Sequence, residues 1–213
     1  MKNQSNINKV LEFLKLHHDT FFQAAVFAEQ TQHPTPTDTR AYSQIVVSLL
    51  CGVQGRSRKK GSDLEDGSDV KGANAWEAID KPRFNGVIKA GTQSDVSDSM
   101  ASLDKMPRLF LVLWNKEPEH DRERCRIWCV RPRDDQVFRE MCASWYEKRE
   151  NGEIRSNNFQ LHPNIGQNSD KFTNECGNLD YPLLFCAEFV AGEYHLKIYR
   201  PEILRTGLCT KAD

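Results

Sequence analysis

The sequence lacks a long apolar stretch and an excess of either charge. Its longest uninterrupted apolar run is Leu109–Trp114, six residues, whereas a membrane span needs about 18. Its 29 Lys and Arg against 30 Asp and Glu give a formal net charge of −1, which excludes a bulk field that draws the chain onto nucleic acid or acidic lipid. The N-terminus enters an amphipathic pattern without an apolar signal core. We therefore expect a cytoplasmic protein, with no membrane partner, that meets anions through local patches.

Paired cysteines at metal-binding spacing are also missing. The seven cysteines are odd in number and lie mostly inside apolar patterns, which is typical of reduced thiols. Cys125 and Cys129 have no second pair or clustered histidines at zinc-finger spacing. We expect no disulfide framework, and we expect oxygen ligands for any metal.

What the chain does contain is an alternation of helical and strand patterns. A helical face over residues 7–14 is followed, after His17 and His18 at an expected helix break, by a second amphipathic stretch. The strongest helical pattern covers residues 36–51, with a capping signal at its start and Gly52 after its end. Strands are expected at 109–114 and 124–130 with a link at 115–123, then a helix capped by Asp134, and a closing hairpin formed by 183–190 and 194–199.

The most informative segment is 55–71, where a basic run is followed by an acidic one. Asp66-Gly67 is a turn dipeptide, which predicts a hairpin-like bend between a short strand near Asp63 and another strand through residues 69–71. Strand alternation then places Asp69 and Lys71 on one face. Two carboxylates can hold Mg²⁺, and the lysine can reach a water and a phosphate, as phosphodiester hydrolysis requires. An acidic turn beside a solvated strand explains the same residues without chemistry.

This segment resembles the PD-(D/E)xK nucleases, whose metal site is an Asp followed by a D/E-x-K tripeptide, here Asp69-Val70-Lys71. Residues 62–71 are especially similar to the compact motif of mismatch-repair MutH, with a turn one residue shorter. Residues 69–76 and 80–85 resemble type II restriction endonucleases of the MamI type. No Pro precedes Asp63, and the second acid is Asp and not Glu.

The resemblance implies an α/β fold of the restriction-endonuclease-like PD-(D/E)xK kind, with a mixed central β-sheet flanked by helices and a C-terminal β-hairpin. It implies a single nuclease domain over 1–213, with a helical N-terminal part at 5–51, a catalytic core at about 36–150, and an amide-rich recognition loop and closing hairpin at 151–205. The carried-over site has Asp63 and Asp69 as metal ligands, Lys71 activating water, Asp66 as a rival ligand, and Leu64 and Val70 facing the core. Gln44 on the preceding helix could fill a position that some relatives use near the metal, but we do not count it among the site residues.

Two segments are candidates for contacting DNA. The first is the basic run before the acidic turn, because a neutral chain must meet phosphates locally; the second is the amide-rich segment 156–178, because Asn and Gln pair with adenine edges. Solvated polar loops explain both segments equally well. The candidate DNA-binding residues are Arg56, Arg58, Lys59, Lys60, Lys81, Arg83, Asn157, Asn158, Gln160 and His162, with Lys89 extending the basic surface and His162 fixing the loop.

These expectations combine into a Mg²⁺-dependent type II restriction endonuclease that cuts double-stranded DNA at a specific sequence. A cognate DNA methyltransferase is implied as a functional partner, and a homodimer is expected because a palindrome presents two equivalent strands. Its interface could use Phe21, Phe22, Val26 and Phe27, with core packing as the alternative for these side chains. The open alternatives are a structure- or mismatch-specific DNA repair nuclease with the same metal site, and a non-catalytic DNA-binding or interaction protein.

Overall fold

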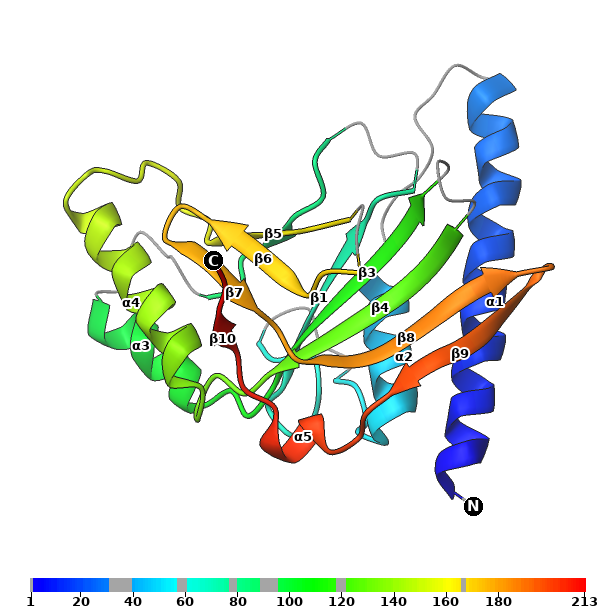
Figure 1. Ribbon diagram of the computed structural model, residues 1–213, viewed down its shortest axis with the longest axis horizontal. Coiled ribbons are helices and arrows are strands. Elements are labelled where there is room, and N and C mark those ends of the chain that lie inside the picture. The colour runs from blue at the N-terminus through cyan, green and yellow to red at the C-terminus, as the bar shows by residue number, and fades with distance from the viewer. Residues whose placement is uncertain are drawn as a thin grey trace.

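The computed structural model describes residues 2–30, 40–56, 61–76, 80–88, 96–117, 122–165 and 168–213. The described residues form two five-stranded sheets with helices that cover them (Figure 1). The helices are α1 (Lys2–Gln30), α2 (Arg40–Cys51), α3 (Val96–Asp104), α4 (Gln136–Glu150) and α5 (Ile203–Thr206). Of the described helices, none is both long and apolar enough to cross a membrane.

The central sheet has the strand order β1-β3-β4-β8-β9. Its strands are β1 (Asp69–Asn74), β3 (Leu109–Glu117), β4 (Arg122–Val130), β8 (Leu183–Val190) and β9 (Glu193–Tyr199). β1 runs parallel to β3 and the other pairs are antiparallel, so the expected mixed sheet and closing hairpin are confirmed. The link expected at 115–123 was wrong in part, because opposite charges at Lys116 and Glu123 pair across the strands and continue the ladder.

Strand register assigns the two faces of this sheet to two separate cores. Lys71 lies opposite Leu111, and Leu111 lies opposite Trp128, so these three side chains share one face. That face packs against α4 and the second sheet. Val70 and Phe110 point to the opposite face, which α1 and α2 cover. Lys71 therefore emerges on the same side of the sheet as the second sheet.

The helix break expected at His17 and His18 was wrong, because α1 continues through both residues. His17 is only 3% exposed, and its ring centroid lies 4.1 Å from that of Tyr42 and 4.4 Å from that of Trp114. Aromatic rings of α2 and β3 thus bury a side chain that the sequence pattern placed at a helix break. Phe21 is also buried and belongs to this core, so it is not available for the dimer interface suggested by the sequence.

The described part of α2 begins at Arg40, and residues 36–39 of the expected helix lie outside the described residues. Its end at Cys51 is confirmed. At the start of α4 the cap is Asp135 and not Asp134: Asp135 Oδ1 accepts a hydrogen bond from the backbone N–H of Phe138 at 3.0 Å. Asp134 instead pairs with Arg131 at 2.7 Å. The local capping pattern was correct to within one residue.

The second sheet was not predicted. Its strand order is β10-β7-β6-β5-β2, with β2 at Phe84–Asn85, β5 at Gln160–Pro163, β6 at Lys171–Asn174, β7 at Gly177–Asp180 and β10 at Thr210–Lys211. The expectation of a loop over 156–178 was therefore wrong for three of its segments. These strands have only four residues each, and such a short strand shows too few alternations to stand out from an amide-rich background.

Candidate active site

The acidic turn, residues 63–69, is held by backbone hydrogen bonds and by the buried side chain of Leu64, and no regular strand precedes it within the described residues 61–68. Gly55 and Leu64 form an isolated β-bridge, and the backbone N–H of Arg56 donates to the carbonyl of Asp63 at 2.8 Å. The side chain of Leu64 is fully buried. The short strand expected near Asp63 was thus wrong, but the reversal of the chain before β1 is present, with Gly67 at φ +94°.

Three functional groups meet where β1 begins. The backbone N–H of Val70 donates to Asp63 Oδ2 at 2.9 Å, and Gln44 Nε2 donates to Asp63 Oδ1 at 2.7 Å. Lys71 Nζ pairs with Asp69 Oδ2 at 2.7 Å. The Asp63 side chain is therefore oriented from two sides, by the strand and by α2. The structure places Gln44 beside the site, although the sequence analysis did not count it among the site residues.

The electrostatics of this group favour a bound cation. Burial, with help from the neighbouring carboxyl of Asp69, raises the pKa of Asp63 to about 7 from its ordinary value of 3.8. The Val70 N–H and the charge of Lys71 oppose this shift only in part. Two neighbouring carboxylates repel each other when both are ionised, and a divalent ion removes that repulsion.

The donor set matches a hard cation that keeps part of its water shell. Within the described ranges no cluster of three or more His, Cys, Asp or Glu side chains could hold a metal. A site with two carboxylates suits Mg²⁺, which commonly binds one or two carboxylates together with waters and substrate phosphates. Asp63 and Asp69 are the residues that would hold it.

Asp66, the rival ligand, has different partners. Its Oδ1 accepts the backbone N–H of Ser68 at 2.9 Å, and its Oδ2 pairs with Arg108 Nη1 at 2.9 Å. Arg108 Nε in turn donates to the carbonyl of Leu204, at 3.1 Å. Both Asp66 oxygens are thus engaged in bonds that fix the turn, and Arg108, directly before β3, links the turn to α5.

The site opens into a hollow of about 380 Å³ that Asp69 and Lys71 line together with Ser102 and Lys105. Sequence reasoning missed Ser102 and Lys105, because they lie more than 30 residues downstream and no local motif marks them. Lys105 is exposed, and no ion pair within the described ranges involves it. Its amine is therefore available to an anion that enters the hollow.

The residues predicted to contact DNA do not form one group in the structure: some of them bond within the protein, others lie near β2 and β5, and four lie outside the described residues. Arg56 Nε and Nη2 donate to the carbonyls of Leu64 and Glu65, at 3.1 and 2.9 Å, so this arginine holds the acidic turn. Asn157 accepts a hydrogen bond from Arg149. Lys81 and Arg83 lie in the segment before β2, Asn158 in a turn before β5, and Gln160 and His162 on β5; Arg58, Lys59, Lys60 and Lys89 lie outside the described residues.

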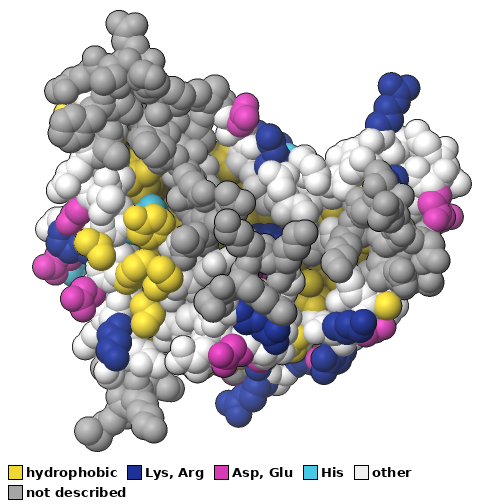
Figure 2. Space-filling model, turned by 180° about the vertical axis from the view of Figure 1, so that it is seen from behind, with side chains coloured by type: hydrophobic (Ala, Val, Ile, Leu, Met, Phe, Trp, Pro, Cys, Tyr) yellow, Lys and Arg dark blue, Asp and Glu magenta, His cyan; other side chains and the backbone are white. Residues whose placement is uncertain are grey.

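Charges of both signs are interspersed on the face shown in Figure 2, and Lys and Arg side chains gather along its lower part. This distribution agrees with a chain of formal net charge −1 that meets anions locally.

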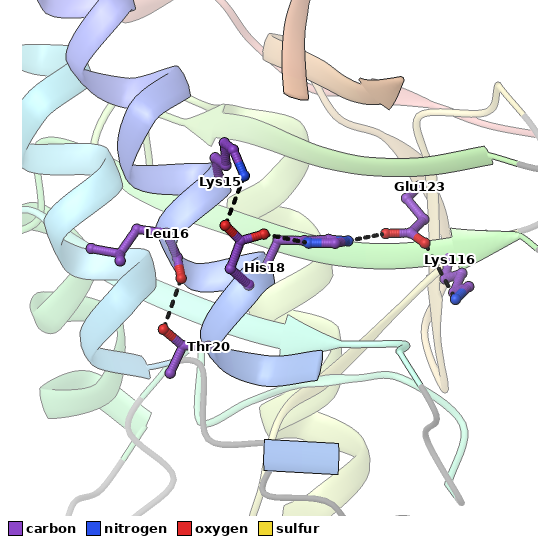
Figure 3. Close-up of polar contacts among 7 residues, drawn as sticks. Lys15, Leu16, His18, Thr20, Lys116 and Glu123 are labelled. Carbon is purple, nitrogen blue, oxygen red and sulfur yellow. Dashed lines mark hydrogen bonds and ion pairs between the residues drawn. The ribbon is translucent and has the colours of Figure 1, made fainter. Parts of the chain in front are cut away.

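A second polar cluster lies between α1 and the ends of β3 and β4 (Figure 3). His18 Nε2 is 2.8 Å from Glu123 Oε2, and Lys116 Nζ is 3.3 Å from Glu123 Oε1. Lys15 pairs with Asp19, whose other oxygen faces His18. Because these groups satisfy one another, we interpret the cluster as an attachment of α1 to the sheet.

The mixed α/β architecture, with its carboxylates and lysine at the edge of the central sheet, is compatible with a restriction-endonuclease-like fold. Comparison with known families agrees: the family described as MamI restriction endonuclease matches residues 26–190, which include Asp63, Asp69 and Lys71. The chain is 30% identical over 165 residues to the type II restriction enzyme MamI of Microbacterium ammoniaphilum. This chain belongs to the MamI restriction endonuclease family.

The alignment with that relative covers 73% of this chain and 53% of the relative, so the chain spans about half the length of the curated protein that it matches. No solved structure matches the chain.

Proposed function

We propose that this chain is a type II restriction endonuclease that hydrolyses phosphodiester bonds of double-stranded DNA at a specific sequence, with Mg²⁺. The observation that carries this proposal is the meeting of Asp63, Asp69 and Lys71 at the start of β1, in a chain of the MamI family; Asp69 and Lys71 line the hollow. The Val70 N–H and Gln44 hold the Asp63 carboxylate, and Lys71 holds that of Asp69, before any ligand arrives, which is the preorganisation that electrostatic catalysis requires.

Each residue has a defined role in this mechanism. Mg²⁺ held by Asp63 and Asp69 would supply positive charge to the phosphate and lower the pKa of an attacking water. Gln44 and the Val70 N–H orient the Asp63 carboxylate. Lys71, held by Asp69, directs its remaining N–H donors into the hollow and orients the attacking water. Lys105 binds a phosphate oxygen at the rim.

The expected partners follow from the reaction. A homodimer would place one such site on each strand of a palindromic duplex. A cognate DNA methyltransferase would protect the host genome from a sequence-specific nuclease. The homodimer and the methyltransferase are both proposals that rest on the membership of this chain in the MamI family.

The decisive experiment is digestion of plasmid and phage DNA by the purified chain, with and without Mg²⁺. We expect discrete fragments only with Mg²⁺, and a loss of roughly 10²–10⁴-fold in rate for Lys71→Ala, the size associated with a positioned group that assists proton transfer. Asp69→Asn should also abolish cleavage. Asp66→Asn is the matched control, because it changes an acid of the same turn that bonds to Arg108, and it should keep activity within a few-fold.

The alternatives give different results. Cleavage restricted to mismatched or branched DNA would identify a repair nuclease. No Mg²⁺-dependent cleavage of any DNA by the folded wild-type chain would refute the nuclease proposal and favour a binding protein. Loss of activity in Asp66→Asn, with Asp63→Asn still active, would move the metal ligand to position 66.

A further inference from the structure

Two arginines are buried on the face of the central sheet that carries Lys71. Arg124 and Arg126 on β4 are each 2% exposed. They alternate with Cys125 and share their face with Trp128, which lies in register with Leu111 and Lys71. Burying two guanidinium groups is expensive unless hydrogen bonds satisfy them, so their partners indicate what they are for.

Their partners lie mainly in one short segment, the connection from β5 to β6, of which residues 164, 165 and 168–170 are described. Arg126 Nη2 and Nη1 donate to the carbonyls of Asn164 and Ser169, at 3.2 and 3.3 Å. Arg124 Nη1 donates to Asn168 Oδ1 at 2.8 Å and its Nη2 to the carbonyl of Ile165 at 3.4 Å. Two planar donor groups therefore hold both arms of this connection at several points.

Trp128 strengthens the attachment, since its Nε1 donates to Asp170 Oδ1 at 3.0 Å. Three side chains of β4 thus bind the β5–β6 connection, and β4 therefore sets the conformation of the described part of this connection. Asn168 is itself exposed, so its amide group is held by Arg124 at the surface.

The second sheet, to which β5 and β6 belong, also reaches the proposed active site. β5 pairs with β2, with Leu161 opposite Phe84. Residues 86–88, directly after β2, line the hollow with Asp69 and Lys71. The second sheet is thus fixed at β2 to the hollow and at its β5–β6 connection to Arg124 and Arg126. A DNA duplex is far wider than the hollow. A duplex bound over the hollow, on the Lys71 face of the central sheet, therefore also contacts the second sheet.

We propose that Arg124 and Arg126 are positioning residues for sequence discrimination: they hold the β5–β6 connection so that its amide and backbone groups meet base edges while the scissile phosphate lies beside Lys71. This inference rests on the proposed function. Base discrimination depends on donors and acceptors placed to within a fraction of an ångström, so loosening the connection weakens recognition more than chemistry.

The test compares Arg124→Lys and Arg126→Lys with wild type. Lysine keeps the charge but cannot donate to two carbonyls from one planar group. The ends produced from phage DNA are sequenced to find the preferred site, and kcat/KM is then measured on that site and on sites that differ by one base pair. Arg139→Lys is the matched control, because Arg139 also donates to a backbone carbonyl, that of Pro132, and pairs with Asp104, and neither partner belongs to the connection.

We expect the preference for the correct site to fall about tenfold or more in Arg126→Lys, the scale of one mismatched base pair, while kcat at the correct site changes little. Arg139→Lys should keep the wild-type preference. Asn168→Ala, an exposed change that leaves the buried arginines in place, should also reduce the preference, and it provides a test if the arginine variants do not fold.

Several outcomes would overturn the inference. One is an unchanged site preference in Asn168→Ala and in a folded arginine variant that merely cleaves more slowly. Another is a wild-type chain that cleaves DNA without sequence preference. A wild-type chain that cleaves no DNA refutes the proposed function itself, which separates the two failures.

Discussion

Three aspartates within seven residues of the acidic turn have sharply different surroundings. Asp63 bonds to α2 and to the start of β1, Asp69 pairs with Lys71, and Asp66 turns toward Arg108. Their side chains are chemically identical, so only their partners distinguish a proposed metal ligand from a residue that fixes the turn. Arg56 is similar, because a basic residue expected to meet DNA uses two donors on carbonyls of the turn.

His17 predicts an acid sensitivity of the fold. Burial, and secondarily the charge of His18, lowers the pKa of His17 to about 4, whereas the unfolded value is about 6.5. Above pH 6.5 the histidine is neutral in both states. Between pH 6.5 and 4 only the unfolded chain takes up the proton of His17, so the contribution of His17 to the free energy of unfolding should fall there, by up to about 3 kcal/mol, whereas the raised pKa of Asp63 acts in the opposite direction.

Urea unfolding at a series of pH values measures this effect. His17→Leu should remove the fall that His17 contributes between pH 6.5 and 4, so its free energy of unfolding should change differently with pH from that of wild type, whereas His195→Leu, at an exposed position on β9, should keep the wild-type dependence. Equal slopes for wild type and His17→Leu would show that other groups cause the acid sensitivity.

The turn before β1 depends on close packing against the chain that leads into β3. Gly67 has φ +94°, and an added Cβ would lie 3.2 Å from the carbonyl oxygen of Lys105. Both a positive φ and this backbone neighbour disfavour any side chain at position 67. The turn and the segment after α3 therefore position each other, and through them the carboxylates and Lys105.

Gly67→Ala should consequently lower the free energy of unfolding by about 2 kcal/mol and reduce DNA cleavage. Gly152→Ala is the matched control, because Gly152 also has a positive φ, +77°, but nothing lies within 4 Å of the added Cβ. It should cost about 1 kcal/mol and leave cleavage unchanged. Thermal or urea unfolding together with plasmid cleavage tests both; equal activity of the two variants would contradict the proposed coupling.

Considered as a whole, the molecule has a formal net charge of −1, so DNA affinity must come from a few cations near the site. Each phosphate contact contributes a slope of about −0.9 to the dependence of log K on log salt. Lys105 is the described cation at the rim of the hollow for which we expect such a contact.

Lys105→Gln should weaken duplex binding and make that salt slope shallower by about 1. Fluorescence anisotropy of a labelled duplex between 50 and 200 mM NaCl, in EDTA to prevent cleavage, provides the measurement. Lys197→Gln should leave the slope unchanged, because Lys197 lies on β9, the edge strand opposite β1, and pairs there with Glu188 of β8. The same slope in wild type and Lys105→Gln would exclude a phosphate contact by this lysine.

The sequence alone determined the features that depend on neighbours a few residues apart. Apolar runs and alternation predicted β3, β4 and the β8–β9 hairpin, and the periodic face over 42–50 predicted α2. The D-x-K spacing placed Asp69 and Lys71 on one face of a strand, where their side chains meet. These results are accessible because backbone geometry repeats every two or 3.6 residues and leaves its period in the sequence.

Only the tertiary structure decided the features that depend on contacts between distant segments. It buried His17 among aromatic rings from three other segments, assembled short strands into a second sheet, and joined Lys105 to the hollow. It also turned Asp66 toward Arg108 and connected Arg124 and Arg126 to a segment about 40 residues away. No local period encodes such pairings, because burial and hydrogen-bond partners are set by the packing of the whole chain.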